Sequence, residues 1–132
     1  LLSGAEEQAQ QLLRAAFSPL VREAGAAACG VFDASGRLLS VSRTGSPGLA
    51  LGLAGVVERI LSAQPHAEMA DGDALMTDDV WIGTGHPCDL TVVTPVFEGG
   101  ALAAFVCSVA HIPESAADHR REGRPVTHLA RR

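Results

Sequence analysis

The feature that most constrains this chain is a pair of strand-like runs joined by two consecutive glycines. Residues 90–93 and 101–109 are mainly apolar, and Glu98-Gly99-Gly100 between them is a turn sequence. Two such runs predict a β-hairpin, in which the start of the first strand lies beside the end of the second. The hairpin therefore decides which residues, distant in the sequence, meet at its open end.

Three side chains with metal-binding chemistry are placed at that open end. His86 follows a glycine-rich segment, Asp89 comes three residues later, and His111 follows the second run. Two imidazoles and one carboxylate form a ligand set for a divalent transition metal, with coordination positions left for water or substrate. We therefore expect His86, Asp89 and His111 to converge in a metal site.

Each of these residues also has a simpler interpretation that the sequence leaves open. His86 can be a loop residue whose ring caps a backbone group, and Asp89 can cap the start of the hairpin. His111 can be a strand-end residue that faces water. Gly83 and Gly85 can serve a tight turn and nothing else.

The three cysteines are far apart and odd in number, so neither a disulfide framework nor a zinc ribbon is indicated. Cys29 and Cys107 lie in apolar strand-like runs and are expected to be small core residues. Cys88 stands between His86 and Asp89, where a thiolate ligand or a nucleophile is an alternative to an inert loop residue. Reduced cysteines make the cytoplasm the simplest location.

Composition narrows the classes of ligand. The 132 residues carry a net charge of −5, which argues against nucleic acid, and no apolar run is long enough to span a membrane. No Walker or dinucleotide motif is present, so an ATP site is not expected in this chain. Much of the 47% hydrophobic content is alanine, which predicts a thin core. Trp81 is expected to plug that core or, alternatively, to form an apolar wall over the site.

The pattern along the chain predicts an α+β domain with a mostly antiparallel sheet and two helices on one side of it, in the order α-β-β-α-β-β-β. This domain is expected over residues 1–112, followed by a polar, flexible tail over 113–132. Besides the hairpin, the expected elements are helices at 5–17 and 49–63 and strands at 27–32, 37–41 and 73–77. Ser18-Pro19 ends the first helix, and Gly52 and Gly55 weaken the second.

The stretch from Gly72 to His111 resembles the metal-binding segment of the hydantoinase B/oxoprolinase family, the B-type subunits of ATP-dependent hydantoinases, oxoprolinases and acetone carboxylases. The resemblance is carried by the strand and glycine-rich turn of residues 72–83, by His86-Pro87-Cys88-Asp89, and by the hairpin that ends in Ala110-His111. Residues 16–19 and 31–38 resemble N-terminal segments of the family. The resemblance covers roughly residues 5–112.

The resemblance implies a divalent metal, manganese, zinc or iron, held by His86, Asp89 and His111. It implies that Asp79 orients a ligand imidazole or fixes the loop. It also implies a hydrolase or carboxylase subunit that acts on a small molecule, by opening a cyclic amide of the hydantoin or oxoproline type or by a related ATP-coupled carboxylation. The implied partners are larger hydantoinase A/B-type subunits, or a second copy of the chain.

This sequence departs from the family pattern at several positions. Asp78 stands where the family has Asn, Val80 where it has Pro, and Ile112 where it has a second His. The match stops after His111, whereas B-type subunits are several hundred residues long, so we expect a truncated subunit. Two other classes stay open: a non-catalytic assembly subunit whose metal is structural or lost, and a small-molecule-binding module with a GAF-like order of elements.

Overall fold

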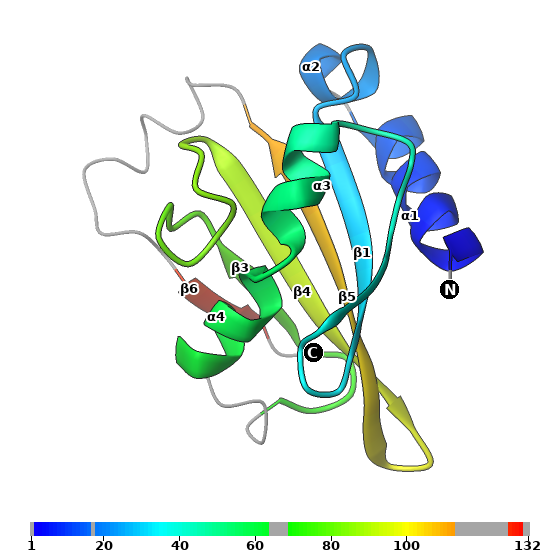
Figure 1. Cartoon of the computed structure of the whole chain (residues 1–132), viewed down its shortest axis with the longest axis vertical. Coiled ribbons are helices and arrows are strands. Elements are labelled where there is room, and N and C mark those ends of the chain that lie inside the picture. Colours follow the sequence, from blue (N-terminus) through cyan, green and yellow to red (C-terminus); the bar gives the residue numbers. More distant parts are fainter. Residues whose placement is uncertain (1, 17, 64–68, 113–126, 131–132) are drawn as a thin grey trace.

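The computed structural model describes residues 2–16, 18–63, 69–112 and 127–130. Its centre is a six-stranded antiparallel sheet with the strand order β2-β1-β5-β4-β3-β6 (Figure 1). The elements are α1 (Leu2–Ala15), α2 (Pro19–Arg22), β1 (Ala27–Asp33), β2 (Leu38–Val41), α3 (Pro47–Leu53), α4 (Val56–Ala63), β3 (Ala74–Thr77), β4 (Asp89–Glu98), β5 (Ala101–His111) and β6 (Thr127–Ala130). The predicted α+β class and antiparallel sheet are confirmed.

Strands β4 and β5 form the predicted hairpin, and its turn fixes the register. Gly99 and Gly100 have φ angles of 58° and 81°. Positive φ at both central residues is the requirement of a type I′ turn, which matches the twist of the two strands. From this turn the ladder extends to Asp89 opposite His111, and its register shifts once, at a bulge between Val96 and Phe97.

Side chains alternate across the sheet, and one face carries the main core. Helices α3 and α4 cover this face (Figure 1). Fully burying an aliphatic or aromatic side chain of this kind contributes about 1.5–3 kcal/mol. The largest completely buried apolar residues are Phe32, Leu53, Val56, Val57, Ile60, Leu75, Val93, Phe105 and Val109.

The first expected helix is followed by a short helix that was not expected, and the second is divided into two. The break at Ser18-Pro19 separates α1 from α2, as the sequence predicts. The segment 49–63 is interrupted at Ala54, where ψ is 5°, and at Gly55. Glycine in a helix interior costs about 1 kcal/mol relative to alanine, which favours a break at Gly55. The short helices on either side of the break both pack on the core.

The expectation that both helices lie on one side of the sheet is wrong. Ala28 and Phe32 of β1 belong to the core under α3 and α4, yet Cys29, which alternates to the opposite face, is also fully buried. Helix α1 packs on β1 and β2 and buries Ala5 and Ala9. The first strand therefore needs a helix on each face, and the small alanines let α1 lie close to it.

Cys29 and Cys107 are buried core residues, as expected. Burial raises the pKa of the Cys29 thiol to about 12 and raises that of Cys107 as well. Both thiols therefore stay protonated at neutral pH.

Part of the expected polar, flexible tail forms a strand. Residues 127–130 form β6, an edge strand paired with β3. The rest of that tail, residues 113–126 and 131–132, lies outside the described residues. Among the described helices, none has both the length and the apolar content needed to cross a bilayer.

A carboxylate ties α1 to the loop that follows β2. Oε2 of Glu6 accepts the N–H groups of Arg43 at 2.8 Å and Thr44 at 3.1 Å, and the Thr44 hydroxyl donates to Oε1. These bonds, the Thr44 hydroxyl first, lower the pKa of Glu6 from 4.5 to about 2. The charged form is therefore the one that the folded state stabilises.

We predict that Glu6→Gln lowers the melting temperature at neutral pH. Because the folded pKa is depressed, the contribution of Glu6 is complete above pH 4.5 and is lost as the pH falls toward 2. The difference between wild type and variant, followed by circular dichroism melts, should shrink through this window. Glu7→Gln, which removes an exposed neighbouring carboxylate, is the control, and a Glu6→Gln effect independent of pH would contradict the assignment.

Candidate functional site

The candidate site lies at the open end of the β4–β5 hairpin. Asp89 is the first residue of β4 and His111 the last of β5, and they are cross-strand partners. Opposite residues of an antiparallel pair point to the same face. The Nδ1 atom of His111 lies 2.8 Å from Oδ1 of Asp89. The hairpin register alone thus creates a carboxylate–imidazole pair.

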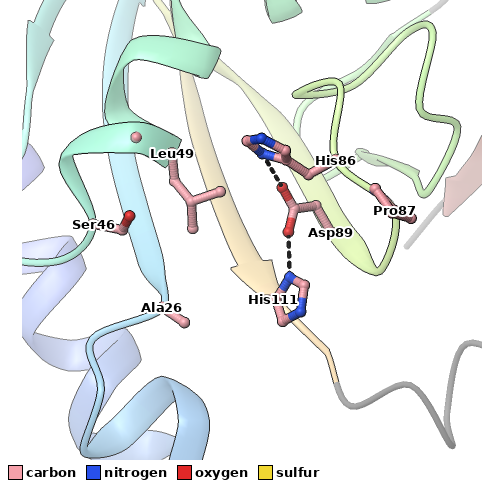
Figure 2. Close-up of a pocket in the computed structure, with 8 residues that line it drawn as sticks. Ala26, Ser46, Leu49, His86, Pro87, Asp89 and His111 are labelled. Atoms are coloured by element: carbon pink, nitrogen blue, oxygen red, sulfur yellow. Dashed lines mark hydrogen bonds and ion pairs between the residues drawn. The ribbon is translucent and has the colours of Figure 1, made fainter.

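The second histidine comes from the loop before β4. Nδ1 of His86 lies 3.8 Å from Oδ2 of Asp89, and Figure 2 shows the two imidazole rings on opposite sides of the carboxylate. The Asp89 side chain is 2% exposed, against 62% for His86 and 35% for His111. The structure therefore brings together the three predicted residues as a buried carboxylate between two accessible imidazoles.

These three residues form one wall of a pocket of about 410 Å³. The opposite wall comes from the segment before β1 and from the beginning of α3 (Figure 2). Its members are Ala26, Ser46, Gly48 and Leu49, and Pro87 completes the lining beside His86. The pocket thus combines a small, mostly apolar enclosure with one cluster of ionisable groups, which is the usual composition of a small-molecule site.

The loop between β3 and β4 is held in place by side chains that hydrogen-bond to its backbone. Nε of Arg59 donates to the carbonyl of Ile82 at 3.1 Å, and Nη2 of Arg59 donates to the carbonyl of Gly83 at 2.8 Å. Oδ1 of Asp79 accepts the N–H of Trp81 at 2.8 Å. This contact is of the loop-fixing kind, one of the two roles expected for Asp79.

The backbone turns sharply just before Asp89. Cys88 has a φ of 70°, a left-handed conformation that non-glycine residues adopt at a cost of about 1–2 kcal/mol. Its carbonyl accepts the N–H of Ile112 at 2.7 Å, and the N–H of His111 donates to Ala26 at 2.9 Å. These bonds join the loop, the end of β5 and the segment before β1, and all three contribute residues to the pocket lining.

Trp81 occupies neither of its expected positions. The side chain is 87% exposed, so it does not plug the core, and it does not line the pocket. The Asp79 cap holds the backbone of this loop in a turn that directs Trp81 outward.

Sequence reasoning did not identify Thr84, whose hydroxyl donates to Oδ2 of Asp89. It also missed Ala26, Ser46 and Leu49, because their only signal is a fold that places α3 over the end of the hairpin. As the side chains stand, no three His, Cys, Asp or Glu residues within the described ranges are arranged around one metal position. The role of His86, Asp89 and His111 as metal ligands remains a prediction.

Comparison with known proteins finds that the chain is similar to part of much longer proteins. The family model for hydantoinase B/oxoprolinase matches residues 1–119. The 5-oxoprolinase PfmaA of Pestalotiopsis fici is 32% identical over 113 residues, covering 83% of this chain and 8% of that protein. The acetone carboxylase alpha subunit of Xanthobacter autotrophicus is 28% identical over 122 residues, covering 89% and 15%.

The fold is shared as well. A nucleotide-free structure of acetone carboxylase, determined for the mechanism of ATP-dependent acetone carboxylation, matches with a TM-score of 0.67 and 28% identity. The match covers 85% of this chain and 15% of that one. The chain therefore spans only 8–15% of the length of the relatives it matches.

We predict that one thiol per chain reacts quickly with Ellman's reagent at neutral pH. Cys88 is half-buried, whereas Cys29 and Cys107 are buried with raised pKa values. Cys88→Ser should abolish the fast phase, while Cys29→Ser should leave it unchanged. If added Mn²⁺ or Zn²⁺ slows the Cys88 reaction, the thiolate-ligand alternative gains support. A fast phase that survives in Cys88→Ser would contradict the described core.

Proposed function

The chain belongs to the hydantoinase B/oxoprolinase family, and from that premise we propose that it supplies a divalent-metal site for an ATP-coupled reaction. The ligands are His86, Asp89 and His111, and the metal is manganese, zinc or iron. The reaction is hydrolysis of a cyclic amide of the hydantoin or oxoproline type, or a related carboxylation. The observation that carries the proposal is the buried Asp89 carboxylate between two imidazoles on a pocket wall.

The residue types of the three proposed ligands suit such a metal. Imidazole nitrogens and a carboxylate oxygen are donors that manganese, zinc and iron bind in proteins. Oδ1 of Asp89 bonds to Nδ1 of the His111 ring at 2.8 Å, and Oδ2 lies 3.8 Å from Nδ1 of His86, so the three side chains face one another. The His86 side chain is 62% exposed, so it has room to turn toward Asp89.

Asp89 also determines the state of the His111 ring. An ionised carboxylate only accepts hydrogen bonds, so its bond with Nδ1 places the imidazole proton on that atom. Nε2 then keeps a lone pair, which binds a cation or takes a proton from an attacking water. When bound, a divalent cation supplies Lewis-acid polarisation of a carbonyl group. Asp89 and His111 thereby fix the side of the pocket on which a bound cation would act.

Larger subunits supply the remaining functions in this proposal. The sequence contains no Walker motif, and one of the matched relatives is itself called an alpha subunit. ATP-dependent activation is therefore assigned to a partner, and the pocket beside Asp89 receives the small carbonyl compound. Its apolar wall of Ala26 and Leu49 suits the methylene groups of a compact cyclic amide.

We predict that the isolated chain binds Mn²⁺ or Zn²⁺ in isothermal titration calorimetry, and that variants at the site weaken binding. Loss of a positioning partner costs about 10- to 100-fold in metal affinity. His86→Ala, His111→Ala and Asp89→Asn should lose at least that much, and a direct ligand should lose more. Asp71→Asn, which removes an exposed carboxylate elsewhere, is the matched control.

The possible results separate the alternatives. Equal affinity in wild type and both histidine variants, with unchanged circular dichroism, would show that the ligands are wrongly assigned. If the folded wild-type chain binds neither metal after reconstitution, the metal proposal fails and the assembly function leads.

That second function is favoured by a separate observation. Trp81 and Leu51 are 87% and 79% exposed, and tryptophan is among the residues enriched at protein interfaces. If the chain serves as an assembly subunit by self-association, sedimentation velocity should show a dimer that Trp81→Ser shifts to monomer. Leu39→Ser, at a side chain 50% exposed on β2, is the control. A monomeric wild type would contradict self-association.

A further inference from the structure

The carboxylate of Asp89 is held at both oxygens by residues from different segments. Oδ1 faces Nδ1 of His111 at 2.8 Å, and Oδ2 accepts the hydroxyl of Thr84. Oδ2 is also the oxygen that faces His86. The Thr84 hydroxyl is therefore placed to orient the carboxylate relative to the two imidazoles.

A second anchor is needed because the terminal torsion of an aspartate is soft. Rotation about the bond to the carboxylate carbon has a broad, roughly two-fold profile, so the bond with His111 alone leaves its plane poorly fixed. The Asp89 side chain is 2% exposed, and solvent therefore does little to replace a missing donor. A hydroxyl bond at Oδ2 fixes the plane and satisfies the remaining buried acceptor.

Thr84 reaches this position because helix α3 carries a glycine where the loop passes over it. A Cβ atom at position 52 would lie 3.2 Å from the Cβ of Thr84 and 3.4 Å from its carbonyl oxygen. An alanine there would push the loop outward by a few tenths of an ångström. Gly52, which weakens the helix in sequence terms, therefore provides the space in which Thr84 stands.

We infer that Thr84, seated against Gly52, is a positioning residue of this site. Its hydroxyl orients the Asp89 carboxylate toward His111 and thereby sets the tautomer and orientation of that imidazole. The inference rests on the proposed function only for its consequence for metal affinity, because the hydrogen bonds themselves belong to the metal-free chain.

The test compares Thr84→Val, which keeps the shape and removes the donor, with Thr84→Ser, which keeps the donor. The first readout is the ¹⁵N shift pair of the His111 ring in the metal-free protein, recorded at one pH. Thr84→Val should move this pair away from the Nδ1-protonated pattern, and Thr84→Ser should retain it. The second readout is the Kd for Mn²⁺, which Thr84→Val should raise by about 10- to 100-fold and Thr84→Ser should largely preserve.

Gly52→Ala gives a variant that separates positioning from general stability. Alanine improves helix propensity, which offsets part of the cost of displacing the loop, so the melting temperature should fall less than in Thr84→Val, yet the His111 signals should shift in the same direction. Unchanged His111 signals in a folded Thr84→Val protein would overturn the inference. If wild type binds no Mn²⁺ but the His111 signals respond, the metal function fails while the positioning role stands.

Discussion

The register of the β4–β5 hairpin is the constraint on which the rest of the structure depends. It is set by the type I′ turn at Gly99-Gly100 and extends along the full ladder to Asp89 and His111. A slip of one residue would move every side chain of one strand to the opposite face. Val93 would leave the core, and Asp89 would leave the pocket. Folding stability and the site are therefore specified by the same pairing, since both use the same face.

The site gains its order from segments that are remote in sequence but meet at one end of the sheet. The loop from β3 contributes His86 and Thr84, α4 holds that loop through Arg59, and α3 covers it. Asp89 stands at their junction and is almost completely buried. A buried carboxylate is costly unless its oxygens are bonded. The bonds from Thr84 and His111 meet that requirement. These bonds also restrict where the two side chains lie beside the pocket.

The family relationship and the geometry contribute different parts of the functional account. Family membership indicates a chemical context of larger enzymes, of which this chain spans a small share. The geometry supplies what can be tested in the chain itself: a carboxylate between two imidazoles, a mostly apolar enclosure, and a loop with an outward tryptophan. Both the metal proposal and the assembly alternative rest on these local features.

The sequence by itself determined the hairpin, and through it the meeting of Asp89 with His111, because turn chemistry and two-residue alternation are local rules. It also determined the break at Ser18-Pro19 and the burial of Cys29 and Cys107. Only the tertiary structure decided that α1 covers the second face of β1 and that α3 completes the pocket. It also placed Trp81 outside the core, and it gave Gly52 its function as a space for Thr84. These outcomes depend on how elements pack across long sequence separations, and neither helix propensity nor the local pattern of apolar residues carries that information.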